Sequence, residues 1–251
     1  MIMLRLKKLI KGTPIIGGLV VTILGFIRKF RGGDSDDGKQ FYDPKQLKNA
    51  GFQTYFIENK YQIESGNVPD RYMLIANATL GSRVLELGSA DGTQCLVLAR
   101  EKDLVCGVEL MELQYLTALE LKQKWIANGV SMCRCEFFLG GIPEFKKKLP
   151  EYETVLMSRV LYHLRSEIYD VMDAISKSNV THVVLVGCPD RSRRYKEGGL
   201  RGDAMGKYAK FASKEGMEEI LEKYGFSISL SAPNDNGFDP IVVGHREISS
   251  K

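Results

Sequence analysis

One stretch of the chain combines residue types suited to holding a nucleoside. An apolar run leads into a turn of small residues, and a helical pattern follows, in the order Val84-Leu85-Glu86-Leu87-Gly88-Ser89-Ala90-Asp91-Gly92-Thr93. Glycine has no Cβ, so this turn lets the backbone approach a ligand closely. Glu109 ends the next apolar run, 21 residues after Gly88, and a carboxylate there accepts two hydrogen bonds from a ribose diol. The spacing predicts a nucleoside site at this turn.

A later stretch carries side chains suited to proton transfer and to binding an acceptor. It reads Ser158-Arg159-Val160-Leu161-Tyr162-His163-Leu164-Arg165 and follows another apolar run. Histidine has an ordinary pKa near about 6.5, so His163 is a candidate general base at neutral pH, with Tyr162 beside it. The alternative is that both side chains cap the next helix or bond to the backbone. Arg159 is a candidate substrate-binding residue.

A third stretch is polar and rich in arginine. It spans residues 187–196 and includes Arg191 and Arg194, which we also predict to bind substrate. Arginine binds carboxylate and phosphate in a bidentate manner, so these residues suit an anionic acceptor. The alternative is a solvated loop.

The first stretch resembles the cofactor motif of the class I S-adenosylmethionine-dependent methyltransferases. That motif is acidic-x-Gly-x-Gly-x-Gly, with a further acidic residue at the end of the second strand. Four positions match it, namely Glu86, Gly88, Gly92 and Glu109, whereas Ala90 replaces the middle glycine. The resemblance covers roughly residues 70–246. It implies S-adenosylmethionine as the cofactor and methyl transfer as the activity.

The resemblance also implies which residues bind the cofactor. Glu86 would orient the turn or meet the methionine amine through water, and Glu109 would hold the ribose. Gly88 and Ala90 would line the methionine, while Leu110 and Met111 would flank the adenine. The full predicted set is Glu86, Gly88, Ser89, Ala90, Gly92, Glu109, Leu110, Met111 and Ser158. A nicotinamide enzyme is a weaker alternative, because the third glycine of its Gly-x-Gly-x-x-Gly motif is missing.

The acceptor remains open between two classes. A small-molecule, sugar or lipid-linked acceptor is favoured by the acidic body and the amphiphilic N-terminus. An RNA acceptor is the alternative, because the loop has arginines and the stretch Val160–His163 resembles one in tRNA wobble-uridine carboxymethyl-transferring enzymes and in the small-molecule methyltransferases near them. A third alternative is a non-catalytic protein that uses the same fold to bind a partner.

The pattern of elements predicts an α/β fold, a Rossmann-like three-layer sandwich. Short apolar runs separated by amphipathic stretches indicate a mostly parallel sheet of seven strands, covered on both faces. We expect strands over 83–87, 104–110, 131–139, 154–158 and 182–186, and helices over 93–101, 112–128, 166–177 and 213–224. Residues 225–230 and 240–244 have no helix between them and should form a C-terminal antiparallel hairpin.

Charge divides the chain into unequal parts. Residues 1–31 contain seven basic side chains and no acidic one, and the rest holds 28 basic against 31 acidic side chains. A mildly acidic body does not favour nucleic acid, which needs clustered Lys and Arg. We predict a basic and apolar N-terminal segment (1–31), a linker and helical cap (32–78), and a methyltransferase domain (79–251).

The N-terminal segment contains an apolar run of 13 residues, Ile15 to Ile27. This run is shorter than the roughly 20 residues of a membrane-spanning helix. Three interpretations stay open: a segment at a membrane surface, a helix packed on protein, and disorder. The five cysteines fit no zinc pattern, so we expect no metal and mostly buried, reduced thiols. We expect a cytoplasmic protein, with peripheral membrane contact as the alternative.

Overall fold

The computed structural model describes residues 61–188, 206–232 and 239–247. The predicted segment 1–31, residues 32–60 of the predicted linker and cap, and the loop arginines Arg191 and Arg194 lie outside the described residues.

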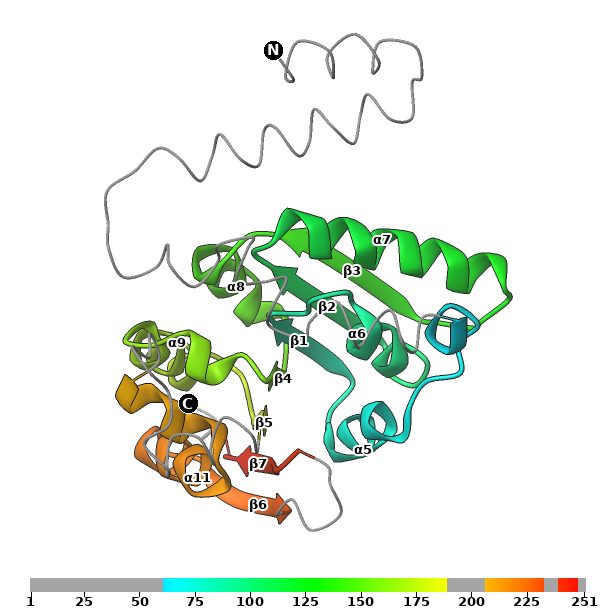
Figure 1. The fold of residues 1–251 in the computed structure, drawn as a ribbon. Coiled ribbons are helices and arrows are strands. Elements are labelled where there is room, and N and C mark those ends of the chain that lie inside the picture. The colour runs from blue at the N-terminus through cyan, green and yellow to red at the C-terminus, as the bar shows by residue number, and fades with distance from the viewer. Residues whose placement is uncertain (1–60, 189–205, 233–238, 248–251) are drawn as a thin grey trace, which may run out of the picture. The chain divides into compact units, whose positions relative to one another are not determined.

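A seven-stranded sheet forms the centre of the described part (Figure 1). Its strand order is β3-β2-β1-β4-β5-β7-β6. Strands β1 to β5 pair in parallel, whereas β7 pairs antiparallel with both β5 and β6. The strands are β1 (Arg83–Leu87), β2 (Leu104–Glu109), β3 (Arg134–Leu139), β4 (Thr154–Ser158), β5 (His182–Val186), β6 (Ser227–Ala232) and β7 (Ile241–His245). The predicted parallel sheet and the antiparallel hairpin are confirmed.

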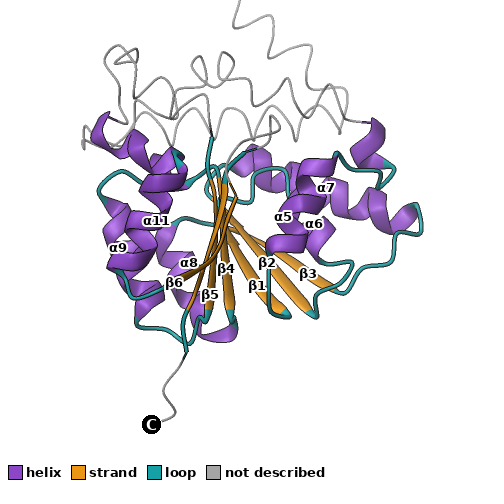
Figure 2. Cartoon of the chain, turned by 90° about the horizontal axis from the view of Figure 1, so that it is seen from below, coloured by secondary structure: helices purple, strands orange, loops and turns teal. Residues whose placement is uncertain are grey.

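Helices cover both faces of this sheet (Figure 2). One face carries α5 (Asp70–Ala78), α6 (Thr93–Leu98) and α7 (Glu112–Ala127), and the other carries α8 (Ile142–Lys148), α9 (Glu167–Ser176) and α11 (Lys214–Lys223). Three short 3-10 helices join them: η3 (Leu149–Glu151), η4 (Leu161–His163) and η5 (Gly206–Ala212). All residues of β2 are buried, as expected for a parallel strand covered on both faces. The three predicted layers are confirmed.

Local backbone chemistry sets several helix ends. Gly129 adopts φ +71° just after α7, where the N–H of Val130 donates to the carbonyl of Trp125. This is the glycine stop that the sequence predicts. At α11, the Ser213 hydroxyl accepts a hydrogen bond from the N–H of Gly216 and caps the helix.

The structure differs from the sequence prediction in several elements. Several helix and strand ends shift by one residue, and the first strand of the hairpin is Ser227–Ala232 rather than 225–230. The helix expected over 93–101 ends at Leu98, because the N–H groups of Arg100 and Glu101 bond to carbonyls three residues back and tighten the chain into turns. The strand expected from residue 131 begins only at Arg134. Helix α8 was not predicted; it is seven residues long and has a proline in its first turn.

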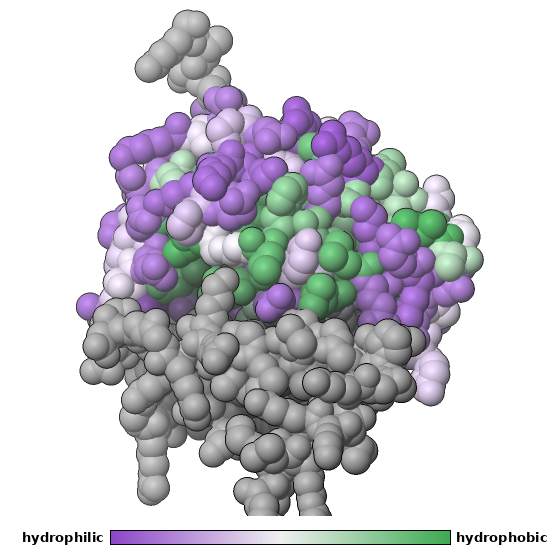
Figure 3. Space-filling model, turned by 90° about the horizontal axis from the view of Figure 1, so that it is seen from above, coloured by the Kyte–Doolittle hydropathy of each residue, from purple (hydrophilic) through white to green (hydrophobic). Residues whose placement is uncertain are grey.

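The surface of α7 is partly apolar. Leu113, Leu116 and Ile126 are exposed on this helix, and Figure 3 shows apolar side chains (green) gathered among polar ones on the face seen from above. None of the helices in the described ranges is long and apolar enough to cross a bilayer.

The cysteines divide into buried and accessible thiols. Cys95, Cys106 and Cys135 are buried, whereas Cys133 is exposed and Cys188 is half-buried. Burial raises the pKa of the Cys106 thiol to about 11 and that of Cys135 to about 12. The predicted burial therefore holds for three of the five thiols.

Candidate functional site

The turn between β1 and α6 has an unusual backbone. Gly88 (φ +77°), Ala90 (φ +48°) and Gly92 (φ +76°) all lie in the left-handed region. Glycine enters this region freely, whereas Ala90 does so at a steric cost. The turn closes through a hydrogen bond from the N–H of Gly92 to the carbonyl of Ser89, 2.9 Å long. The sequence therefore places glycine at two of the three positions that need it most.

Close packing leaves no room for a side chain at Gly88 or at Gly92. A Cβ on Gly88 would lie 2.7 Å from Cγ2 of Val160, and a Cβ on Gly92 would lie 2.6 Å from Cζ of Phe137. Real side chains do not approach so closely. The stretch that follows β4 thus presses against the turn that follows β1, and the two stretches singled out in the sequence meet here.

The carboxylate of Glu109 faces this turn. Its Oε2 accepts a hydrogen bond from the N–H of Ala90 (2.8 Å), and its Oε1 accepts one from the N–H of Met111 (2.7 Å). Desolvation raises the pKa of this buried carboxyl, and the backbone hydrogen bonds oppose that effect. Each carboxylate oxygen keeps a second lone pair, so Glu109 can still accept hydroxyl donors. The predicted approach of Glu109 to the turn is present in the structure.

Two more carboxyls lie close to the turn. Glu86 on β1 is buried, and its Oε2 accepts a hydrogen bond from the Cys95 thiol (3.0 Å). Burial raises the pKa of Glu86 to about 8. Asp91, within the turn, accepts a hydrogen bond from the N–H of Thr93 (3.0 Å), and burial raises its pKa as well. Three acidic side chains with raised pKa values therefore surround one bend of the chain.

Three buried polar atoms at the turn have no hydrogen-bond partner within the described residues. They are Oγ of Ser89, Oγ1 of Thr93 and Oε1 of Gln94. Buried polar groups normally find partners, so such atoms mark positions that a ligand or water satisfies. Together with the close backbone approach, they fit a small polar ligand at this turn.

Helix α5 contributes two residues that sequence analysis missed. Nη2 of Arg71 donates to the Tyr72 hydroxyl (2.7 Å), and Nε2 of Gln94 donates to the carbonyl of Tyr72 (3.2 Å). The positive charge of Arg71 also lowers the pKa of Asp91, against the larger effect of burial. A cation next to an aromatic residue just before the first strand is the signal that could have pointed to them.

The carboxyl end of β4 holds the predicted acceptor residues. Ser158 ends the strand, and Arg159 follows it with φ +57°, a strained conformation of the kind that gathers at functional sites. Nε of Arg159 lies 2.5 Å from Oδ2 of Asp239, which precedes β7 and was not predicted. Tyr162 is buried, and its ring centroid lies 4.4 Å from that of half-buried His163. The four predicted residues flank Val160, which packs against Gly88, so the stretch that carries them follows the same end of the sheet as the turn.

The remaining predicted cofactor residues are Leu110 and Met111, at the junction of β2 and α7. Leu110 is 54% exposed and Met111 is half-buried, so an apolar surface lies open beside Glu109.

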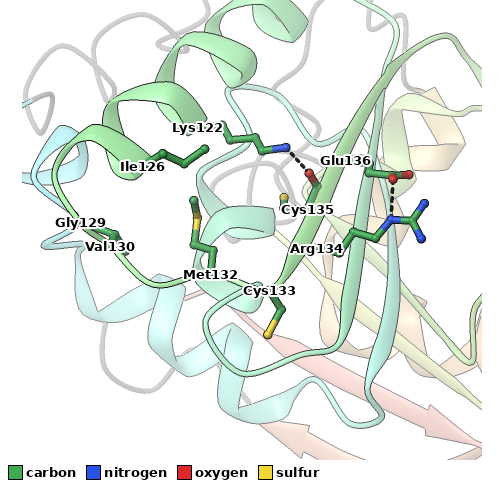
Figure 4. Close-up of a pocket in the computed structure, with 9 residues that line it drawn as sticks. All are labelled: Lys122, Ile126, Gly129, Val130, Met132, Cys133, Arg134, Cys135 and Glu136. Carbon is green, nitrogen blue, oxygen red and sulfur yellow. Dashed lines mark hydrogen bonds and ion pairs between the residues drawn. The ribbon is translucent and has the colours of Figure 1, made fainter.

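A separate cavity of about 390 Å³ lies between α7 and the amino end of β3 (Figure 4). Nζ of Lys122 donates to the carbonyl of Cys135 there, and Arg134 pairs with Glu136. The turn follows the carboxyl end of β1. Because the strands are parallel, the amino end of β3 lies at the opposite end of the strands from the turn. Its lining offers no cluster of metal-ligating side chains, and none is found elsewhere in the described ranges.

Comparisons with known proteins agree on the fold. No protein-family model matches the chain, and a search of curated proteins finds no match in sequence. Among solved structures, the chain is similar to magnesium protoporphyrin IX methyltransferase from Synechocystis PCC 6803 with bound S-adenosylhomocysteine, at 19% identity and a TM-score of 0.50, over 90% of this chain and 95% of that one.

Two further structures show the same likeness. The N-methyltransferase NodS from Bradyrhizobium japonicum matches at 15% identity and a TM-score of 0.53, over 71% of this chain and 96% of that one. An O-methyltransferase family protein from Burkholderia thailandensis matches at 11% identity and a TM-score of 0.55, over 94% of this chain and 72% of that one. With its strand order and its antiparallel β7, the chain has the fold of the class I S-adenosylmethionine-dependent methyltransferases.

Proposed function

We propose that the chain binds S-adenosylmethionine at the turn between β1 and α6 and transfers its methyl group to a small-molecule, sugar or lipid-linked acceptor. One observation carries the proposal: three left-handed positions in one turn, with the buried carboxylate of Glu109 hydrogen-bonded to the middle one. The fold supports it, because solved structures with this fold include methyltransferases with bound cofactor or cofactor product.

Each predicted cofactor residue has a defined role in this proposal. Glu109 accepts the ribose hydroxyls, Leu110 and Met111 border the adenine, and Gly88, Ser89 and Ala90 line the methionine. Gly92 keeps the turn narrow against Phe137, and Ser158 borders the cofactor from the end of β4.

Methyl transfer requires alignment more than chemical assistance from the protein. The bound cofactor supplies an activated methyl group on a sulfonium, so the chain has to hold the acceptor in line with it. His163, whose ring lies tilted beside that of Tyr162, takes a proton from an acceptor that must lose one. Arg159, held by Asp239, binds an anionic part of the acceptor.

A matched pair of glycine substitutions tests the location of the site. Gly88 and Gly129 are both left-handed, but a Cβ would meet Val160 at Gly88 and nothing within 4 Å at Gly129. Gly88→Ala should lower the affinity for S-adenosylmethionine at least about tenfold in calorimetry, roughly 1.4 kcal/mol. Gly129→Ala carries the same backbone strain and should leave the affinity unchanged. Equal affinities in the two variants would show that the turn does not bind the cofactor.

A labelled-methyl assay identifies the acceptor class. Purified protein and cofactor with a radioactive methyl group are incubated separately with small-molecule, lipid and RNA fractions. Label in the small-molecule or lipid fraction supports the proposal. Label found only in RNA would instead show that the acceptor is RNA. In that case the binding of RNA to the protein should also weaken steeply as the salt concentration rises.

A further inference from the structure

The three carboxyls around the turn differ in how their negative charge is stabilised. Glu109 accepts hydrogen bonds from two backbone N–H groups, and Asp91 accepts one from the N–H of Thr93. Glu86 accepts its hydrogen bond from the thiol of Cys95, a weak donor. Of the three, Glu86 therefore has the least stabilisation for its ionised form.

The surroundings of Glu86 make ionisation more costly still. It is 2% exposed, and the titratable groups that act on it are Cys95 from α6, Asp91 from the turn, Glu109 from β2 and Cys135 from β3. Strand β4, which also pairs with β1, has no titratable side chain. Asp91 and Glu109 repel a charge on Glu86, and the Cys95 thiol remains protonated because burial raises its pKa. Arg71 on α5 brings a positive charge to this cluster, and that charge lowers the pKa of Asp91.

The buried carboxyl of Glu86 stays protonated near neutral pH unless a positively charged group binds next to it. The pKa of Glu86, about 8, leaves roughly 90% of it protonated at pH 7. The methionine part of S-adenosylmethionine carries an ammonium, a sulfonium and a carboxylate group, so its net charge is +1. Its two cationic groups would enter a cluster of three acids, and an adjacent cation favours the ionised form of a carboxyl.

We propose that Glu86 gives up its proton when S-adenosylmethionine binds, so that binding exchanges the proton of a buried acid for the positive charge of the ligand. This inference rests on the proposed function. The proton passes from the carboxyl to the solvent, and no bond of the cofactor changes. The net charge of the site is then the same in both states, because the ligand brings the one positive charge that the lost proton removes, and the ionised Glu86 is not left as an unpaired buried charge.

Proton release is measured by calorimetry at pH 7 in phosphate and in Tris, two buffers whose ionisation enthalpies differ. The wild-type chain should release close to one proton per cofactor bound. Its affinity should rise about tenfold per pH unit between pH 6 and pH 7.5, because the linkage slope of one proton is one. Glu86→Gln should bind without proton release and without that rise. Glu101→Gln changes an exposed carboxylate three residues after the end of α6, and it should behave as the wild type.

A second variant keeps the test informative where Glu86→Gln binds too weakly to measure. Cys95→Ser replaces the thiol by a stronger donor to Glu86, which lowers the carboxyl's pKa and moves the affinity rise to lower pH. Fewer protons are then released at pH 7. Methylthioadenosine has the sugar and the base but no amino acid, so it should bind without proton release.

Two outcomes separate the two proposals. If the wild-type chain binds no S-adenosylmethionine, the proposed function is wrong. If it binds without releasing a proton, or if release persists in Glu86→Gln, the cofactor site stands and the role of Glu86 is overturned. Persistent release would assign the proton to Asp91 or Glu109.

Discussion

Glu86 links the stability of the unliganded chain to pH. Its carboxyl has a pKa near its ordinary value of 4.5 when unfolded and of about 8 when folded. Between these values the folded state binds more protons, so its contribution to stability is complete below about pH 4.5 and is lost as pH rises towards 8. Glu86→Gln should remove this loss, which reaches at most about 1.4 kcal/mol per pH unit.

Urea denaturation at pH 5.5, 6.5 and 7.5 checks this prediction. The difference in unfolding free energy between Glu86→Gln and wild type should grow in favour of the variant as pH rises. Asp91 and Glu109 contribute in the same direction to both proteins, so they cancel in the difference. A constant difference would contradict the buried, protonated state of Glu86.

Ala90 has a Cβ at a position whose left-handed backbone conformation favours glycine. At φ +48° its Cβ costs about 1–2 kcal/mol, against roughly 0.5–1 kcal/mol of extra chain entropy that glycine loses on folding. Ala90→Gly should therefore raise the unfolding free energy by up to about 1 kcal/mol and keep the cofactor affinity. Ala127→Gly, at the exposed last residue of α7, should instead lower it by about 0.5–1 kcal/mol. Thermal denaturation of the pair compares the two.

At the scale of elements, two neighbouring strands carry a pair of histidines. The pair lies at the amino end of β5, which is the opposite end of the parallel strands from the turn. His182 and His245 are direct partners in the antiparallel ladder, and their ring centroids lie 5.4 Å apart. Burial, and then the charge of His245, lowers the pKa of His182, while Glu153 opposes this. Protonation is thus disfavoured in the folded state, and stability should be lost as pH falls below about 6.5.

His245→Gln tests this pairing between strands. The variant removes the charge that opposes protonation of His182, so it should lose less stability than wild type between pH 7 and pH 5. Urea midpoints at the two pH values measure the effect. A larger loss in the variant would show that the two rings do not repel each other. Because this effect has the opposite sign to that of Glu86, the two contributions to stability should partly cancel below about pH 6.5.

At the scale of the whole molecule, a ligand that binds only the folded state raises its stability. S-adenosylmethionine at 100 times its dissociation constant should add about 2.7 kcal/mol of unfolding free energy. For a chain of this size that corresponds to a rise of roughly 5–10 °C in Tm. NAD at the same concentration should leave Tm unchanged, since the turn has no third glycine for a dinucleotide. A shift with NAD and none with S-adenosylmethionine would reverse the assignment of the ligand.

The sequence predicts best what depends on neighbours along the chain. The bounds of β1, β4 and β5 match their apolar runs, because a buried parallel strand is apolar on both faces. The approach of Glu109 to the turn was also predictable, since the carboxyl ends of adjacent parallel strands share an edge. Helix α8 was missed because it is short and has no clear apolar periodicity.

Other parts of the site depend on contacts that local patterns do not encode. Arg71 reaches the turn from α5, and Asp239 reaches Arg159 across 80 residues. The state of Glu86 follows from burial under α6, and its pairing with Cys95 becomes visible only after the strand and the helix pack. Such features follow from tertiary packing, which a single sequence does not reveal.

The position of β7 in the sheet affects how the chain folds during translation. β7 follows β6 in sequence but is inserted between β5 and β6, and β6 pairs with β7 alone in the sheet. During synthesis on the ribosome, β5 therefore remains an open edge and β6 has no partner until residues 241–245 emerge. A chain whose translation stops before Ile241 would expose both strands to other nascent chains, even though strands β1 to β4, which carry the proposed cofactor site, had already been synthesised.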